Sequence, residues 1–318
     1  MGEKRSRLGT RRRLASLLAA GAGAAALVAA GQGDRAAANS SLERHGGATS
    51  NIYLVTVQAG RVTRLTSNRV GEEDKLAYSP SWSPTGRKLV FTETRCHECD
   101  SEIHLIDARR PGSNWLADRI GYGFKPAWSP DGKTIAYVGP QGDIFTMSSN
   151  GSNNRLVVRG GLANDDPTWS PNGKQLVFTR QVTASRWQIY EVGRDGRDLK
   201  RLTSGDAATV NPSWASHARK IAFARQAKSG RWQIYTMNGD DGRLHRLSTG
   251  RASDSDPTWS PDASQIAFVR EQFPKTAVFV MNADGSSVRR LTRDSLNAIQ
   301  PAWSPDGLQI AVVGRPSR

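Results

Sequence analysis

Short apolar runs recur along most of the chain, and each is bounded by glycine, proline, aspartate or asparagine. Runs such as 220–224, 233–238 and 276–282 are too short for buried helices and are apolar on both faces. Such runs predict β-strands in sheets that are covered on both sides. We therefore expect an all-β protein in which sheets stack face to face.

The apolar runs belong to six repeated units, and each unit is centred on a tryptophan. These residues are Trp82, Trp128, Trp169, Trp214, Trp259 and Trp303, separated by 46, 41, 45, 45 and 44 residues. In each unit Pro-x-Trp, or its equivalent, leads into a turn of the Ser-Pro-Asp-Gly type, two apolar runs, a second turn and a short basic segment. This order predicts four antiparallel strands, the organisation of a β-propeller blade, with the tryptophan packed between blades.

The two ends of the repeat region complement each other. The last unit contains only its first two strands and stops near Gly314, whereas residues 51–66 contain the two strands that it lacks. Five complete blades and one composite blade predict a six-bladed β-propeller closed by pairing of its ends. Closure removes open sheet edges from the ring, so truncation of either end should unfold the protein.

The repeats Pro-x-Trp-Ser-Pro-Asp-Gly-x-x-Ile-Ala-Phe and Ile-Tyr-x-Met-Asn-x-Asp-Gly-x-x-x-Arg-Leu-Thr resemble those of the TolB family of six-bladed, WD-like propellers. The resemblance covers residues 51–314. TolB itself carries an α/β domain before its propeller and works in the periplasm with an outer-membrane lipoprotein. Residues 39–50 are too few for that domain, so we expect it to be missing. Similar propellers also occur in prolyl-oligopeptidase-type peptidases and in pectin-degrading lyases with a histidine-bound metal.

Residues 1–38 have a different pattern and are expected to be an export signal. An arginine cluster, which resembles a twin-arginine signal, precedes an uncharged stretch at 14–30, and an Ala-x-Ala site ends at Ala38. Cleavage is the first expectation and an uncleaved anchor is the alternative. Residues 39–50 would form a short linker and residues 51–318 the propeller of a periplasmic, cell-envelope or secreted protein.

The charge of the chain narrows the class of partner. The formal net charge is +15, of which the seven Lys/Arg and two Asp/Glu of residues 1–38 supply +5. The remaining excess of positive charge favours acidic proteins, anionic polymers or membrane surfaces, and a merely solvated surface is the alternative. Nucleic acid is not an expected partner outside the cytoplasm, and the propeller is expected to be monomeric.

The sequence contains no Gly-x-Ser-x-Gly, His-Glu-x-x-His, phosphate-binding loop or EF-hand motif. Its five histidines are scattered, with His97 and His104 on a different unit from His217 and His245, and they are not expected to converge on one metal, so no enzymatic activity is predicted. Cys96 and Cys99 are the only cysteines. A small-loop disulfide is expected for them in an oxidising compartment, and a zinc site with His97 and His104 is the alternative.

The residue before the proline of each unit is expected to lie at one mouth of the central channel. These residues are Ser79, Lys125, Asp166, Asn211, Asp256 and Gln300. Asp165 and Asp254 lie beside two of them, so this mouth should be polar and partly acidic. It could bind a peptide, a basic group or a cation such as calcium, or the side chains could only stabilise turns.

A second candidate surface comes from the segment Arg-Trp-Gln-Ile-Tyr, which occurs in two neighbouring units. Arg186 with Trp187 and Arg231 with Trp232 predict an aromatic and basic rim patch for a polysaccharide or a protein. The alternative is that each arginine only covers its indole ring.

The predicted function is that of a non-catalytic, extracytoplasmic scaffold that binds a protein or peptide of the cell envelope at the channel mouth or rim. A glycan-binding or anionic-polymer-binding propeller and a metal-dependent carbohydrate lyase are the alternatives. No cofactor is expected apart from a channel-bound cation.

Overall fold

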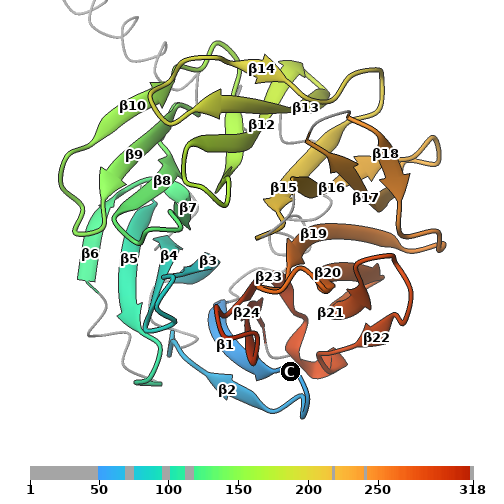
Figure 1. Cartoon of the computed structure of the whole chain (residues 1–318). Helices are drawn as coiled ribbons and strands as arrows, with labels where there is room; N and C mark the ends of the chain where they lie inside the picture. Colours follow the sequence, from blue (N-terminus) through green and yellow to red (C-terminus); the bar gives the residue numbers. More distant parts are fainter. Residues whose placement is uncertain are drawn as a thin grey trace, which may run out of the picture. The chain divides into compact units, whose positions relative to one another are not determined.

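The computed structural model describes residues 49–68, 75–94, 101–111, 118–216, 219–239 and 242–315. The chain divides into two compact units, Met1–Arg44 and His45–Arg318, and all the described residues belong to the second. In that unit, strands β1 to β24 form six antiparallel sheets of four strands each, arranged around a central axis (Figure 1). The predicted six-bladed, all-β propeller is confirmed.

The strands follow the order of the repeats. Blade 1 consists of β3 (Leu76–Trp82), β4 (Lys88–Thr94), β5 (Glu102–Asp107) and β6 (Asp118–Tyr122). Blade 2 consists of β7 (Phe124–Trp128), β8 (Thr134–Val138), β9 (Ile144–Ser148) and β10 (Arg155–Val158). Blade 3 consists of β11 (Asn164–Trp169), β12 (Gln175–Thr183), β13 (Arg186–Gly193) and β14 (Lys200–Arg201). Blade 4 consists of β15 (Thr209–Trp214), β16 (Lys220–Gln226), β17 (Trp232–Asn238) and β18 (Leu244–Arg246).

Blade 5 and the composite blade 6 complete the ring. Blade 5 consists of β19 (Ser253–Trp259), β20 (Gln265–Gln272), β21 (Lys275–Asn282) and β22 (Arg289–Arg290), and a 3-10 turn, η2 (Asp294–Leu296), follows it. Blade 6 consists of β23 (Ile299–Trp303), β24 (Gln309–Gly314), β1 (Asn51–Thr56) and β2 (Val62–Arg64).

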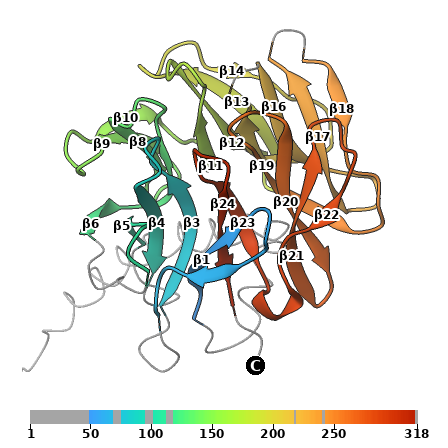
Figure 2. The ribbon, with the colours of Figure 1, turned by 60° about the horizontal axis from the view of Figure 1, so that its bottom comes forward.

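Blade 6 joins the two ends of the propeller, as the sequence predicts. Its strand order is β2-β1-β24-β23, and β1 pairs with β24 from Asn51 opposite Gly314 to Thr56 opposite Gln309. Figure 2 shows β1 beside β24. A side-chain hydrogen bond also holds the start of β1 against the segment after β2: Asn51 Nδ2 donates to the Asn68 carbonyl at 3.1 Å.

The core lies between blades. Phe91, Phe178, Phe223 and Phe268 occupy the same position in the second strands of blades 1, 3, 4 and 5, and all four side chains are fully buried. Trp259 of blade 5 packs in one apolar cluster with Ala222 and Ile234 of blade 4. The predicted packing of the tryptophans between blades is thus confirmed, although Trp128 is only partly buried.

Several indoles also tie one blade to the preceding blade. Trp82 Nε1 donates to the Ala302 carbonyl, and Trp169 Nε1 donates to the Ala127 carbonyl, each at 3.1 Å. The first of these bonds crosses the closure of the ring, so the composite blade is held by the same contact as a continuous one.

The ring has two ends that differ in the connections they carry. Turns between the first and second strands of each blade, such as Ser260 to Gln265, lie at one end, which we call the mouth face. Hairpins between the second and third strands, and the loops that join blades, lie at the other end, which we call the hairpin face.

Candidate binding site at the channel mouth

A β-bulge interrupts the first strand of every blade at the same place. The register shifts just before the x of Pro-x-Trp, for example between Asp165 and Thr168 in β11 and between Ser255 and Thr258 in β19. A bulge turns the chain locally and re-aims the side chain of the extra residue. Each bulge therefore places one additional side chain toward the axis of the ring.

The residue before the proline in each bulge has a left-handed backbone. The φ angles lie between 48° and 55° for Ser79, Lys125, Asp166, Asn211, Asp256 and Gln300. Residues other than glycine rarely adopt this conformation, and it costs each of them about 1 kcal/mol or more. The sequence did not reveal this geometry, although six identically placed Pro-x-Trp elements were the signal that could have indicated it.

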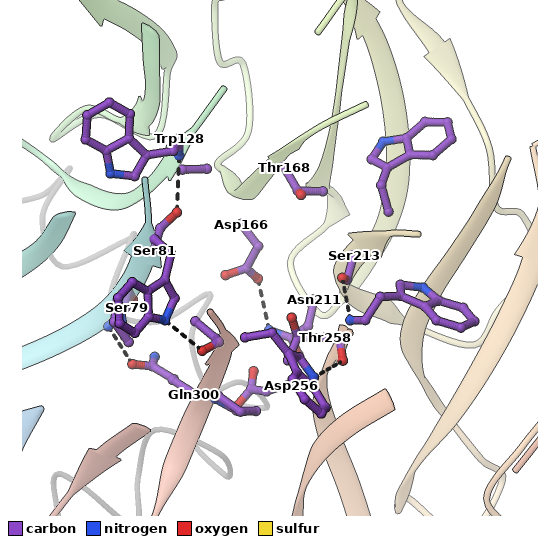
Figure 3. A pocket seen from close by; sticks show the side chains of 18 of the residues that line it. Ser79, Ser81, Trp128, Asp166, Thr168, Asn211, Ser213, Asp256, Thr258 and Gln300 are labelled. Carbon is purple, nitrogen blue, oxygen red and sulfur yellow. Dashed lines mark hydrogen bonds between the residues drawn. The ribbon is translucent and has the colours of Figure 1, made fainter. Parts of the chain in front are cut away.

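All six of these residues line one cavity of about 390 Å³ at the mouth face. The prolines and tryptophans of the same elements complete its wall, together with small polar residues at the x position such as Ser81, Thr168 and Ser213. Figure 3 shows Asp166, Asn211 and Asp256 close to one another on neighbouring strands. The structure thus brings together every residue that the sequence assigned to the mouth, and we call these six residues the mouth ring.

One half of the mouth ring is joined by charged hydrogen bonds. Lys125 Nζ lies 2.9 Å from Asp166 Oδ1, and Asn211 Nδ2 donates to Asp166 Oδ2 at 3.1 Å. The side chains of Lys125 and Asp166 are 15% and 12% exposed, so this ion pair is largely shielded from solvent. Low exposure strengthens the attraction, and one carboxylate therefore holds three blades in register at the mouth.

The other half of the mouth ring is joined across the closure of the propeller. Gln300 Oε1 accepts a hydrogen bond from the Ser79 backbone amide at 2.8 Å, which links blade 6 to blade 1. The Ser79 hydroxyl is buried and forms no hydrogen bond with another described residue. Asp256 adds a second carboxylate to the wall. Since Lys125 neutralises Asp166, the mouth ring carries a net negative charge.

The two acidic residues beside the mouth ring have structural partners. Asp254 is fully buried, and its carboxylate accepts hydrogen bonds from Arg270 Nε and Nη2 at 2.8 and 2.9 Å. Arg270 in turn lies over the ring of Phe279 at 5.0 Å. Asp165 Oδ1 accepts a hydrogen bond from the Asp166 amide at 2.8 Å and so supports the bulge itself. Asp254 and Asp165 therefore stabilise the wall of the channel.

The structure places the proposed rim patch differently from the prediction. Trp187 and Trp232 are 6% and 8% exposed and lie in one apolar cluster, so neither indole presents a face to solvent. Arg186 forms a salt bridge with Asp206 at 3.2 Å, whereas Arg231 is exposed. The expected surface of stacked aromatic rings is therefore corrected to two buried tryptophans, because both indoles fill the space between blades.

Cys96 and Cys99 lie outside the described residues, as do His45, His97 and His217. His104 is buried against Phe91, and its Nε2 lies 3.1 Å from Glu102 Oε2. His245 is exposed on β18. Among the described residues, no group of three or more His, Cys, Asp and Glu side chains is arranged to hold a metal ion.

Comparisons with known proteins agree with this architecture. The model of the TolB beta propeller domain matches residues 42–229 and 207–317. A comparison with curated protein sequences finds no match.

The structure is similar to putative TolB from Agrobacterium tumefaciens, with a TM-score of 0.70, 21% identity and coverage of 86% of this chain and 100% of that protein. TolB from Acinetobacter baumannii gives a TM-score of 0.63 and 18% identity, and the match covers 81% of this chain and 66% of that protein. The structure of an oligogalacturonate lyase in complex with manganese is more distantly similar, with a TM-score of 0.53 and 13% sequence identity. The match covers 86% of this chain and 97% of the lyase. The family match covers the whole propeller and its repeats, and the chain therefore belongs to the TolB β-propeller family.

Proposed function

We propose that this protein is a non-catalytic, extracytoplasmic binding protein whose channel mouth engages a segment of a protein or peptide partner. The observation that carries this proposal is the variation within the mouth ring. Its six residues share one backbone conformation, yet they comprise serine, lysine, two aspartates, asparagine and glutamine. Glycine would meet the conformational requirement at every position with the least strain.

The choice of side chains at the mouth ring therefore requires a reason other than the bulge. Asparagine and aspartate tolerate a left-handed backbone, but lysine and glutamine have no comparable preference for it. Strained residues that persist in this way cluster at binding sites and active sites. The six positions together present donors, acceptors and a net negative charge in a cavity large enough for a few side chains.

This chemistry favours an extended polypeptide with a cationic group over a neutral or anionic ligand. Because Lys125 neutralises Asp166, Asp256 supplies the net charge that attracts the cation, while Asn211 and Gln300 offer groups for backbone hydrogen bonds. The oligogalacturonate lyase resemblance concerns the fold alone, and no feature of the mouth ring favours that chemistry over partner binding.

The propeller of residues 39–318, immobilised as bait in cell-envelope extract, tests this proposal. Asp166→Asn combined with Asp256→Asn should lose a partner that the unaltered propeller retains, because both carboxylates of the mouth are removed. Asp195→Asn combined with Asp284→Asn, two changes in exposed turns, is the matched control and should retain it. A partner captured equally by all three proteins would contradict binding at the mouth.

The location is part of the proposal and rests on the pattern of residues 1–38, which lie outside the described part of the chain. Within the described part, no helix has the length and apolar character needed to cross a membrane. Cell fractionation of the full chain tests export, and fractionation of a variant with Arg12→Lys and Arg13→Lys tests the twin-arginine route. Recovery of the unaltered protein in the cytoplasm would contradict the proposed location.

A further inference from the structure

Blades 4 and 5 carry a group of exposed cations on the hairpin face, at the end of the ring opposite the mouth. Lys228 and Arg231 lie in the β16–β17 hairpin, Arg251 lies in the loop between β18 and β19, Lys275 begins β21, and Arg293 follows β22. All five residues are exposed, and none forms a salt bridge with another described residue. We call these five residues the cationic patch.

Contacts between the segments show that the cationic patch is continuous. The Trp232 amide, next to Arg231, donates to Ser253 Oγ at 3.3 Å. Gln233 Nε2 donates to the Gly250 and Ala252 carbonyls, both at 3.3 Å, and these residues flank Arg251. The hairpin of blade 4 therefore lies against the loop that leads into blade 5.

The same continuity extends across blade 5. Ser253 pairs with Glu271 in the β19–β20 ladder, and the Thr276 amide donates to Asn297 Oδ1 at 2.8 Å. Lys275 and Arg293 therefore border the same surface as Arg251. Some arginines elsewhere in the described part of the chain are paired, for example Arg119 with Glu102 and Arg270 with Asp254.

Few carboxylates oppose the cationic patch. In the described segments 226–232, 249–253, 271–276 and 291–297, the acidic residues are Glu271, which is partly buried, and Asp294. Asp294 forms a salt bridge with Arg290, which offsets its charge. Asp294 also interacts with Lys275, but the cationic patch keeps a clear excess of positive charge, so this surface attracts an external anion.

A large apolar side chain protrudes on the same hairpin face, two residues before Lys275 of the cationic patch. Phe273, at the tip of the β20–β21 hairpin, is 87% exposed, the highest value among the exposed large apolar residues of the described part. Gln272 and Lys275 flank it at the tip. Transfer of this ring from water into an apolar environment would be favourable, so Phe273 suits a partner that offers both anionic groups and apolar depth.

The chain also enters the propeller on the hairpin face. β1 begins at Asn51 opposite Gly314, and Ser50 Oγ donates to the Ala77 carbonyl near the start of β3. The described part of the chain therefore begins at the same end of the ring as the cationic patch.

We propose that the hairpin face of blades 4 and 5 docks on the surface of a lipid bilayer that contains anionic phospholipids. The cationic patch binds the headgroups, and Phe273 inserts among the upper parts of the acyl chains. A cationic surface with an aromatic side chain fits the interface of a bilayer, where charge and apolar depth are offered together. In this orientation the mouth ring faces away from the membrane.

Lipid vesicles test this docking directly. The propeller of residues 39–318 forms a closed ring with its own core and can be studied alone. It is sedimented at low salt with vesicles of phosphatidylcholine alone or of phosphatidylcholine mixed with phosphatidylglycerol. We expect binding only to the anionic vesicles, and release at high salt because screening weakens the attraction to the headgroups.

Three variants separate this surface from the general charge of the protein. Lys228→Glu with Arg231→Glu should lower the partition coefficient about tenfold or more, and Phe273→Ser should lower it about fivefold. Lys200→Glu with Arg289→Glu makes the same change in net charge on the exposed edge strands β14 and β22 and should leave binding nearly unchanged. Circular dichroism and the melting temperature confirm that each variant is folded.

Three results would overturn the proposal. These are no binding to the anionic vesicles, an equal loss of binding in the edge-strand control, and unchanged binding of Phe273→Ser. Soluble polyglutamate is the competing partner in a parallel experiment. Binding to polyglutamate as tight as binding to vesicles, and indifferent to Phe273→Ser, would assign the cationic patch to an anionic polymer and exclude the membrane.

Discussion

The first strands and the second strands of the blades differ in what they repeat. In the second strands, blades 1, 3, 4 and 5 place a phenylalanine at the same buried position, and all four side chains are inaccessible to solvent. In the first strands, all six blades repeat a left-handed bulge but use five different residue types there. Packing between blades thus restricts the buried position of the second strand to a large apolar side chain in these four blades. At the mouth ring only the backbone conformation is shared, and the side chains can differ to serve binding.

The largest effect is expected from the buried phenylalanines. Phe223→Ala should lower the free energy of unfolding by about 3–5 kcal/mol, because it leaves a cavity beside Tyr235, whose ring centroid lies 6.1 Å away. Chemical denaturation measures the change, and Phe223→Leu should lose clearly less. A loss below about 1 kcal/mol for the alanine variant would show that the inter-blade core tolerates variation as the mouth does.

The next largest difference in stability is expected between variants of two aspartates in β19 that have different surroundings. Asp254→Ala should cost about 3 kcal/mol, because it leaves the guanidinium of Arg270, 19% exposed, without its carboxylate. Asp256→Asn, at the mouth, should change stability by less than about 1 kcal/mol while it weakens partner binding. Denaturation curves of both variants test this contrast.

A compensating change sharpens the comparison within β19. Asp254→Ala combined with Arg270→Met should recover much of the lost stability, since no buried charge is then left unpaired. A double variant as unstable as Asp254→Ala would show that the loss comes from packing and not from the unpaired charge.

A smaller effect should reveal the cost of the bulge conformation. Ser79→Gly should be more stable than Ser79→Ala by about 1 kcal/mol, because glycine adopts a φ of 51° without steric strain. Both changes remove the buried hydroxyl, so the difference isolates the backbone. Equal melting temperatures of the two variants would contradict strain at the mouth ring.

The smallest effect concerns the turns at the mouth face. Hydrogen bonds from Ser260 and Ser264 lower the pKa of Asp262 to about 2. Because the folded-state pKa lies below the unfolded value, this stabilisation is present above about pH 4 and disappears as the pH falls toward 2. The melting temperature of Asp262→Asn should therefore fall less between pH 5 and pH 3 than that of the unaltered protein. The difference should be small because Asp262 is exposed. An unchanged drop would contradict this contribution.

The sequence was sufficient for the fold because its signals are local and repeated. Each turn, apolar run and tryptophan recurs six times, and the missing strands of the last repeat are visible at residues 51–66. The structure confirms the composite blade in the predicted strand order, with β1 between β2 and β24. Nothing beyond pattern and turn chemistry was needed for these conclusions.

The site was only partly accessible from the sequence. Pro-x-Trp identified which residues surround the channel, but the bonds from Asp166 to Lys125 and Asn211 join residues on three blades that no local pattern relates. The burial of Trp187 and Trp232 was also missed, because the same Arg-Trp-Gln-Ile-Tyr segment is compatible with an exposed rim or with a filled space between blades. Such distinctions depend on the neighbouring blade.

The pairing of Asn51 with Gly314 has a mechanical consequence. Because β1 and β24 are antiparallel, the first residue of one lies opposite the last residue of the other, at one end of the composite blade. A force that pulls the two chain ends apart would load these backbone hydrogen bonds one after another and not all together. The propeller should therefore resist heat as a closed ring, yet open at low tension by unzipping blade 6 and then peel away from that seam.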